Sequence, residues 1–469
     1  MNYNLLIITP DQLRSDYLGC YGHKSIGTAN IDIMAAKGVV FDNCYCAAPL
    51  CAPSRISFAT STYVGEHNRR NYGTSISPDV PNLITRLKQH GYRTGMFGKN
   101  HLFTYQRLGE VWDELDEICL GNYEGHPKSQ RAFSSFEMEA DHPCNITSRL
   151  TDETIGFMSR TEAPFIAWVN YQDPHPAFTC PQPYYEMFCH KDIVLPEAYY
   201  KYTAASQPIR NQVWRVHSEM NDCSEDDLRK AIAVYMGQIR YIDDSVGRLM
   251  ASLKQNGLDE NTIVLFFSDH GELLGDYNMT HKLPVFYDCL TKIPVILCHP
   301  HKWAGMRFAG LVEQVDLAPT LLEMLNVSIP HTMVGKSLTA ALDTGSDSGK
   351  ETVLVEAGAG APTWKKPGEG LVLSAPHAPT SFGPGAMLRY KTWKLSMYTD
   401  DICELYNLAD DPHELNNRYD DPTCAEIQAK MTIMLLKRVL GVKMRDVGLD
   451  WDESEYPVDV RFNPLECME

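Results

Sequence analysis

The sequence has no apolar run long enough to cross a membrane. Its first apolar segment, Leu5-Leu6-Ile7-Ile8, is followed at once by Thr9 and Pro10, and no basic residue precedes it. A membrane helix needs about 20 apolar residues, and a secretory leader needs a basic start before a longer apolar stretch. We therefore predict no membrane partner, and we expect the protein to be cytoplasmic.

The sequence has fewer basic than acidic residues. The chain has 42 Lys and Arg against 60 Asp and Glu, which gives a formal net charge of −18. Nucleic acids are bound through phosphate contacts that need a basic surface, so the charge argues against a nucleic-acid partner. Any site for a small anion must be locally positive, through a metal ion or a few converging Lys, Arg and His side chains.

The cysteines match neither the spacing of a zinc site nor the dense pattern of a disulfide framework. The 14 cysteines are spread over 469 residues, and Cys44, Cys46 and Cys51 have no nearby cysteine pair that would complete a zinc site. Without a leader, reduced thiols are expected rather than a disulfide framework. A chain of this length, with 44% hydrophobic and 22% charged residues, is typical of a soluble globular protein. Two domains are expected, because single cores rarely exceed roughly 300 residues.

Short apolar segments alternate with helical patterns up to about residue 345. We expect strands at 4–9, 39–41, 92–97, 164–171, 262–267 and 293–297, and helices at 30–37, 79–90, 224–256 and 316–325. Continuously apolar strands between helices are typical of a large, mostly parallel sheet with helices on both faces. This predicts an α/β domain over 1–345.

The pattern changes after about residue 345. Glycine, proline and serine become frequent, and antiparallel-looking strands follow at 386–398 and 402–408, with a helix near 422–440. We therefore predict a smaller α+β domain over 346–469 with an antiparallel sheet. The irregular segments 105–148, 180–222 and 357–385 are expected to be loops that border a site and determine its substrate.

Polar residues follow the ends of several predicted strands. They are Asp11 and Gln12, Lys99 and His101, His175, Asp269 and His270, with Lys282 shortly afterwards. The carboxyl ends of parallel strands meet at one edge of a sheet, where sites of open α/β sheets form, and carboxylates there can hold a hard cation. Taken singly, residues such as His175 and Lys282 are more often structural, but together they predict one site.

The stretch Cys51-Ala52-Pro53-Ser54-Arg55 has the pattern of a loop that feeds a helix. Pro53 and Ser54 suit the entry to a helix, which places Cys51 near the positive end of the helix dipole and beside a guanidinium. Anions bind well at such a position. A lone cysteine before a helix is more often buried and inert, so the rest of the sequence must decide its role.

This pentapeptide resembles the Cys-x-Pro-Ser-Arg signature of the type I sulfatases, which belong to the alkaline-phosphatase-like superfamily. Further segments resemble the family's motifs in the family's order: Asp11-Gln12, Gly98-Lys99-Asn100-His101, Asp173-Pro174-His175, Ser268-Asp269-His270-Gly271, Lys282, Glu404-Leu405-Tyr406-Asn407-Leu408 and Asp411-Pro412-His413-Glu414-Leu415-Asn416-Asn417. The resemblance covers most of the chain. It implies an alkaline-phosphatase-like fold and the hydrolysis of a small anionic sulfate ester of an alcohol or sugar.

The resemblance also implies roles for the residues. A formylglycine-generating enzyme would oxidise Cys51 to formylglycine, whose hydrate attacks sulfur, and a divalent metal would be held by Asp11, Gln12, Asp269, His270 and the modified residue 51. Lys99 and Lys282 would hold the sulfate oxygens. His175 would protonate the leaving oxygen, His101 would assist at the hydrate, and Arg55 would stabilise the hydrate.

Two positions depart from the commonest family pattern. Many members have Asp where this chain has Gln12, and Asn where it has His270. The pair found here resembles the phosphonate monoester hydrolases, so hydrolysis of a phosphonate monoester or phosphodiester is the alternative activity. Calcium is the family's usual metal, but an amide and an imidazole make manganese or another transition metal plausible. A relative that binds but does not turn over, with Cys51 left as a thiol, is the third alternative.

Overall fold

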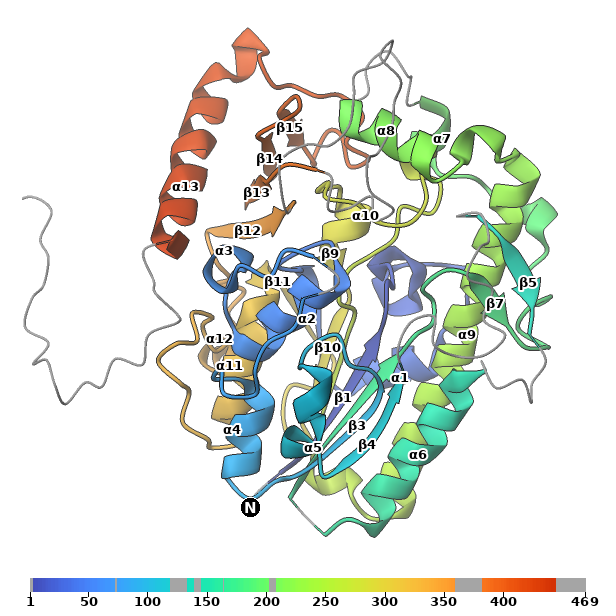
Figure 1. Cartoon of the computed structure of the whole chain (residues 1–469), viewed down its shortest axis with the longest axis vertical. Coiled ribbons are helices and arrows are strands. Elements are labelled where there is room, and N and C mark those ends of the chain that lie inside the picture. The colour runs from blue at the N-terminus through green and yellow to red at the C-terminus, as the bar shows by residue number, and fades with distance from the viewer. Residues whose placement is uncertain are drawn as a thin grey trace, which may run out of the picture.

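The computed structural model describes residues 3–71, 74–118, 133–138, 145–162, 164–201, 208–358 and 382–443 (Figure 1). Within them a nine-stranded sheet has the order β11-β2-β10-β8-β1-β6-β3-β4, and β9 pairs with β2. The strands are β1 (Asn4–Pro10), β2 (Val39–Tyr45), β3 (Arg93–Lys99), β4 (Glu114–Ile118), β6 (Phe165–Tyr171), β8 (Thr262–Phe267), β9 (Lys292–Ile293), β10 (Val295–Cys298) and β11 (Met306–Glu313).

Most neighbouring strands of this sheet are parallel. β1 lies between β6 and β8 and is parallel to both, and β3 is parallel to β6 and β4. β10 is antiparallel to both of its neighbours, β2 and β8, so β2 points the same way as β8. The carboxyl ends of β1, β2, β3, β6 and β8 therefore meet at one edge, as the sequence predicts.

Helices cover both faces of the sheet (Figure 1). One face packs against α2 (Cys51–Thr60), α4 (Leu83–Gln89), α5 (Leu108–Val111), α11 (Leu317–Met324) and α12 (Thr339–Thr344), and the other against α1 (Ala29–Ala36), α6 (Ile146–Arg160) and α9 (Glu225–Gln255). Leu5 and Ile7 enter the first core, whereas Leu6 and Ile8 enter the second. Burial on both faces explains why β1 is apolar at successive positions.

The longest helix, α9, has the start that its sequence predicts. The Ser224 hydroxyl accepts a hydrogen bond from the Asp227 backbone N–H at 3.1 Å, and the Asp227 carboxylate accepts one from the Ser224 N–H at 3.2 Å. This capping box satisfies two backbone donors at the helix terminus. Among the described residues, no helix is long and apolar enough to span a membrane.

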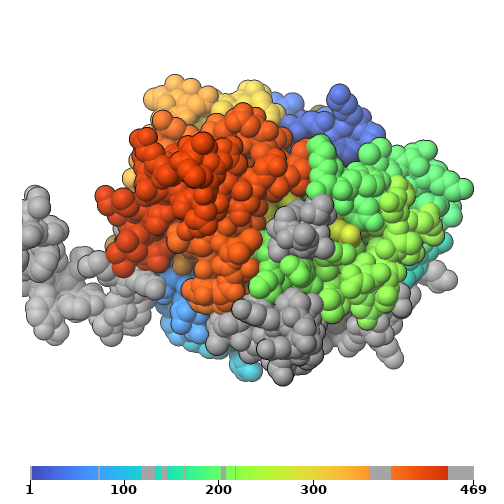
Figure 2. All heavy atoms as spheres, turned by 90° about the horizontal axis from the view of Figure 1, so that it is seen from above, coloured from blue at the N-terminus to red at the C-terminus, as the bar shows by residue number. Residues whose placement is uncertain are grey.

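The C-terminal part contains a second, antiparallel sheet of four strands. They are β12 (Thr352–Ala357), β13 (Gly385–Tyr390), β14 (Trp393–Tyr398) and β15 (Glu404–Asn407), and α13 (Ala425–Lys443) packs against them. Figure 2 shows these residues, in orange and red, against the green part of the chain that contains α8 (Ile209–His217). The predicted fold class, a large mostly parallel sheet with a smaller antiparallel one, is confirmed.

Ion pairs with buried cations join this C-terminal part to helices of the preceding part of the chain. The Lys394 ammonium on β14 lies 2.7 Å from a carboxylate oxygen of Asp288, at the start of α10 (Asp288–Thr291), and 2.7 Å from one of Glu414. On α8, the Arg210 guanidinium lies 2.6 Å from the Asp400 carboxylate. Glu414 belongs to the C-terminal signature recognised in the sequence, and its place here is structural.

The segment 105–148 is more regular than predicted. β4 adds an edge strand to the main sheet, and α6 begins at Ile146. The half-exposed acidic side chains of β4 hide the apolar pattern of a strand, because only Ile118 of this edge strand is well buried. Residues 119–132 and 139–144 lie outside the described part of the chain.

In the segment 180–222, predicted as a long loop, the described residues include two α-helices. α7 (Glu197–Lys201) and α8 form a small apolar core with the region around α10, in which Val213 and Trp214 of α8 are buried. A short helix that packs on a small separate core has few apolar residues. The 3.6-residue repeat that identifies a helix in the sequence is then too short to recognise. In the third predicted loop, 357–385, residues 359–381 lie outside the described residues.

Candidate active site

Cys51 is the first residue of α2. The prediction that the helix starts at Pro53 and Ser54 is wrong by two residues: Leu50 is the N-cap, and Pro53 lies in the first turn, where its missing N–H leaves no bond unmade. Ser54 is not a cap, since its hydroxyl donates to the Asp269 main-chain oxygen at 2.6 Å. The sulfur therefore lies at the positive end of the helix.

Three side chains, which follow two strands, converge around Cys51. Asp11 follows β1, Asp269 and His270 follow β8, and one ligand atom of each lies within 4.8 Å of the others and of the sulfur. All four are buried. We call Asp11, Cys51, Asp269 and His270 the metal group.

The chemistry of this group fits a divalent cation. His270 Nδ1 lies 2.9 Å from the Gly271 carbonyl oxygen, which can only accept, so Nδ1 carries the proton. Burial opposes protonation of the imidazole, but Asp269 and Cys51 outweigh burial and raise the pKa of His270. In the neutral form, which is the form that binds a metal, the lone pair of Nε2 faces the Cys51 sulfur, 3.2 Å away. Two carboxylates and an imidazole nitrogen are suitable ligands for calcium, manganese and related ions.

Arg55 neutralises both carboxylates of the metal group. Its Nε lies 2.9 Å from Asp269 Oδ2, and its Nη2 lies 3.2 Å from Asp11 Oδ2. The guanidinium also donates to the Asn170 side-chain oxygen at 2.5 Å, at the end of β6. Arg55 is 1% exposed, so these bonds compensate a charge that would otherwise be costly to bury.

Lys99, the last residue of β3, brings a second cation to the group. Its ammonium contacts the Asp11 carboxylate and lies 3.5 Å from the Cys51 sulfur. The preceding Gly98 has φ +114°, and a Cβ there would lie 1.9 Å from the Asn170 carbonyl oxygen. Only glycine fits this close approach of β3 to β6, and that approach places Lys99.

These charges act on the Cys51 thiol and the Asp11 carboxyl. Burial and the charge of Asp11 oppose ionisation of the thiol, but Lys282, Lys99 and His270 outweigh them and lower the pKa of Cys51. Burial also opposes ionisation of Asp11, yet the neighbouring cations, with Lys99 the strongest, hold its pKa well below the usual range. The site is locally positive, as an anion site in an acidic protein requires.

Gln12 and Lys282 lie beside the metal group. The Gln12 backbone N–H donates to Asp269 Oδ1 at 3.1 Å, and the Gln12 side-chain oxygen accepts from the Lys282 ammonium. The Gln12 side-chain nitrogen donates to the carboxylate of Glu272, which the sequence analysis did not assign. Gln12 has φ +69°, a left-handed conformation in which its backbone contacts Asp269 and its side chain contacts Lys282 and Glu272.

The two predicted histidines are held neutral. Burial lowers the pKa of His101 well below 6.5, helped by Lys99 and Arg55, and in the described structure its Nδ1 has no hydrogen-bond partner. Burial also lowers the pKa of His175, helped by Lys282 and Lys99. His175 Nδ1 donates to the Pro176 carbonyl, so Nε2 has its lone pair free.

The structure brings every predicted site residue to one edge of the sheet. Direct contacts link all of them except His101 and His175, which lie within the electrostatic reach of Lys99. Their catalytic roles stay predictions. Sequence reasoning missed Asn170 and Glu272. The signal for Glu272 was its place three residues after Asp269, and for Asn170 its polar side chain near the end of a buried strand.

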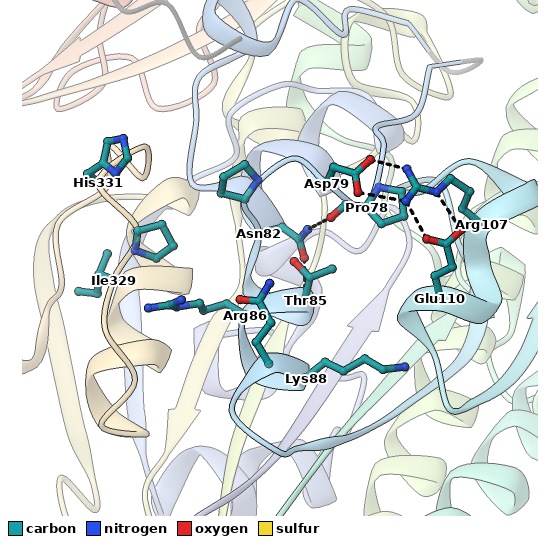
Figure 3. A pocket seen from close by; sticks show the side chains of 13 residues that line it. Pro78, Asp79, Asn82, Thr85, Arg86, Lys88, Arg107, Glu110, Ile329 and His331 are labelled. Carbon is teal, nitrogen blue, oxygen red and sulfur yellow. Dashed lines mark hydrogen bonds and ion pairs between the residues drawn. The ribbon is translucent and has the colours of Figure 1, made fainter. Parts of the chain in front are cut away.

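A separate pocket of about 860 Å³ contains none of these residues (Figure 3). Its Arg107 is paired with Asp79 and Glu110, as the dashed lines in Figure 3 show. The Lys88 ammonium lies 2.9 Å from the Asp113 carboxylate, and Arg86 donates to the Ser328 carbonyl at 3.1 Å. Each of these cations has a protein partner, so the pocket offers no site comparable to that around Cys51.

Comparison with known families decides the class of this site. A family model described as Sulfatase matches residues 3–327. This chain belongs to the sulfatase family. It is therefore a sulfuric ester hydrolase by class. It is similar to an arylsulfatase of Clostridium perfringens, with 28% identity over 379 residues that cover 72% of this chain and 78% of that protein.

Solved structures share the fold. A phosphonate monoester hydrolase of Agrobacterium radiobacter aligns with a TM-score of 0.76 and 22% identity, covering 93% of this chain and 96% of that one. A protein solved in complex with its substrate D-glucosamine-2-N,6-O-disulfate aligns with a TM-score of 0.77 and 20% identity, covering 96% and 100%. These likenesses support the alkaline-phosphatase-like fold for both parts of the chain.

Proposed function

We propose that this sulfatase hydrolyses the sulfate ester of a small alcohol or sugar with a formylglycine made from Cys51. One observation carries the proposal: the side chain of residue 51 lies where Asp11, Asp269, His270 and Lys99 converge. An oxygen nucleophile at this position would face a divalent cation and an ammonium at once. A formylglycine-generating enzyme is the partner that this modification requires.

Asp11, Asp269 and His270, with the Gln12 amide oxygen, would hold the metal together with modified residue 51. A bound divalent cation lowers the pKa of an attached oxygen and neutralises charge on the group being transferred. Calcium is the first candidate by family, and the Gln12 amide and the His270 imidazole also suit manganese.

Lys99 and Lys282 would bind the sulfate oxygens. Both residues are almost fully buried, 1% and 4% exposed, beside the metal group. Fixed cations in a water-poor site stabilise charge that develops in a transition state far better than they would in water. They also overcome the repulsion that a net charge of −18 exerts on an anionic ester.

The two histidines would move protons. A sulfate bound between Lys99 and Lys282 offsets the cations that lower the pKa of His175, so His175 can take up a proton and deliver it to the leaving alcohol oxygen. His101, beside Lys99, would accept the proton of the second hydrate hydroxyl as sulfate is expelled and the aldehyde is restored. Arg55 would stabilise the hydrate.

The first test combines the mass of the Cys51 peptide with turnover. The chain is produced with a formylglycine-generating enzyme, and hydrolysis of 4-nitrophenyl sulfate is measured against the fraction of modified Cys51. We expect activity to follow that fraction and to vanish in Cys51→Ala, while Cys223→Ala, which changes a thiol outside the site, keeps it. A protein with an unmodified thiol and no activity would overturn the proposal.

Hydrolysis of phosphonate monoesters or phosphodiesters is the second candidate, and the pair Gln12 and His270 favours it. Sulfate, phosphonate and phosphodiester groups are all tetrahedral oxyanions that the same lysines could bind. Turnover of 4-nitrophenyl sulfate, bis(4-nitrophenyl) phosphate and 4-nitrophenyl phenylphosphonate by one preparation separates the activities. The substrate with the highest kcat/KM identifies the natural chemistry.

A further inference from the structure

We propose that Glu272 is a positioning residue that fixes the side-chain amide of Gln12 and the ammonium of Lys282, so that residues 12 and 272 work as one unit. The inference rests on the proposed function only in treating Gln12 as a metal ligand. It assigns a role to a buried carboxylate that the site described above does not otherwise use.

Glu272 is fully buried and accepts hydrogen bonds on both oxygens. One oxygen accepts from the Leu274 backbone N–H at 3.0 Å and from the His281 N–H, and the other accepts from the Gln12 side-chain nitrogen. In the described part of the chain no ion pair involves Glu272. Burial raises the pKa of Glu272, whereas these three N–H donors and the nearby Lys282 favour the carboxylate. Two of the donors belong to the segments that carry Gln12 and Lys282.

This arrangement leaves the Gln12 amide one orientation. A carboxylate can only accept, so the NH₂ end of the amide must face Glu272. An ammonium can only donate, so the oxygen end must face Lys282, and the observed contact agrees. The amide oxygen is thereby turned away from Glu272, on a residue whose backbone N–H is bonded to Asp269 of the metal group.

Glu272 also holds the loop of Lys282. The His281 backbone N–H donates to Glu272, and His281 has φ +65°, a left-handed conformation at the residue just before Lys282. The same carboxylate thus anchors the backbone next to Lys282 and orients the amide that receives its ammonium. Glu272 thus positions both Gln12 and Lys282. Ligands in metal sites are commonly oriented by buried hydrogen-bond partners of this kind.

The contact explains why an amide stands at position 12. A carboxylate in place of the Gln12 amide would face the Glu272 carboxylate inside the protein, and two buried like charges at hydrogen-bond distance repel strongly. Conversely, a Gln at position 272 would present its own NH₂ to the Gln12 NH₂. The Gln12 amide would then flip and direct its N–H groups at Lys282 and the metal group.

The test is an isosteric exchange between the two positions. Gln12→Glu creates facing carboxylates, Glu272→Gln creates facing NH₂ groups, and the double variant restores one donor facing one acceptor with no change in volume. We expect each single variant to lower the Tm of the metal-free protein, and Glu272→Gln to raise the Kd for Mn²⁺, measured by calorimetry, by about tenfold. The double variant should recover the Tm and bring the Kd within about threefold of wild type.

Glu404→Gln is the matched control. Glu404 is also a buried carboxylate, but it accepts from the hydroxyls of Tyr287, Tyr398 and Tyr406, far along the chain from the metal group. Its variant should leave the Mn²⁺ Kd unchanged. If Glu272 served only to hold its own loop, Glu272→Gln would lower the Tm and the Mn²⁺ affinity by the same amount whether residue 12 is Gln or Glu. The losses of the two single variants would then add in the double variant, and this result would overturn the inference.

The outcome does not depend on turnover. Tm and Mn²⁺ affinity are measured on the chain with Cys51 as a thiol, so recovery in the double variant supports the inference even if no sulfate ester is hydrolysed. In that case the proposed function would be wrong, but the role of Glu272 would still be supported. Additive losses in a protein that hydrolyses 4-nitrophenyl sulfate would overturn the inference alone.

Discussion

The Arg55 Nε lies 2.9 Å from Asp269 Oδ2, and both side chains are buried. The same guanidinium extends to Asp11, so one cation holds the two carboxylates of the metal group in place. Arg55 acts as the internal counter-charge of this group.

Arg55→Met should destabilise the metal-free protein. Two buried carboxylates lose their partner, and breaking a buried pair by removing one member costs about 3–5 kcal/mol. Calcium should restore part of the loss, because the cation takes over the compensation of Asp11 and Asp269. Urea unfolding with and without calcium measures both effects. Arg107→Met, which breaks an exposed pair with Asp79, is the control and should unfold as the wild type does. An equal loss of unfolding free energy with and without calcium would show that Arg55 does not act as the counter-charge of Asp11 and Asp269.

Lys282→Ala should remove turnover and leave metal binding intact. Loss of one preorganised charge at a transition state lowers kcat by about 10²–10³-fold. The Kd for calcium should not rise, since the variant removes a cation near the metal group. Steady-state kinetics on an aryl sulfate and calorimetry check the two parts. Lys302→Ala, which removes an exposed ammonium 3.0 Å from Asp343, should keep full activity. Full activity in Lys282→Ala would rule out a role for Lys282 in binding the sulfate oxygens.

The site could be predicted from the sequence because its residues follow strands that are buried on both faces. Continuous apolar runs reveal such strands, and parallel strands bring their carboxyl ends together, so Asp11, Lys99 and Asp269 were expected at one edge. Asn170 and Glu272 were not assigned. Their roles depend on which distant side chains face them, Arg55 and Gln12, and spacing along the chain does not give that orientation.

The fold was harder to predict where burial is one-sided or local. β4 lies at the sheet edge with half-exposed acidic residues, and α8 packs on a satellite core, so neither has the apolar period of the central elements. The start of α2 was displaced by two residues because a proline fits anywhere in a first turn. Element types were therefore more predictable than boundaries, which depend on tertiary contacts such as that of Ser54 with Asp269.

Gly98→Ala should impair both stability and activity. The added Cβ would meet the Asn170 carbonyl oxygen at 1.9 Å, and a backbone at φ +114° is strained for alanine. Such strain costs of order 1–3 kcal/mol, and relieving it moves the end of β3, which carries Lys99. Thermal unfolding and kcat/KM measure the two effects. Gly109→Ala on α5 has open space around the added carbon and should not lower either quantity. An active, stable Gly98→Ala would show that β3 can shift without consequence.

Glu313 should make the attachment of the C-terminal helix sensitive to acid. Its carboxylate lies 2.6 Å from Arg438 of α13 and contacts Lys350. Burial opposes its ionisation, but Lys350 and Arg438 outweigh burial and lower the pKa of Glu313 from 4.5 to about 2. A folded pKa below the unfolded one means that the unfolded chain binds the proton first as the pH falls.

The stabilisation by ionised Glu313 is therefore complete above about pH 4.5 and is lost between there and about pH 2, and it amounts to about 3 kcal/mol. Urea unfolding of wild type and Glu313→Gln between about pH 3 and 7 measures it. The difference in unfolding free energy should be constant down to about pH 5 and then shrink. Glu323→Gln, which changes an exposed carboxylate on α11, should show no such change. A difference that stays constant to about pH 3 would show that Glu313 acts through shape rather than charge.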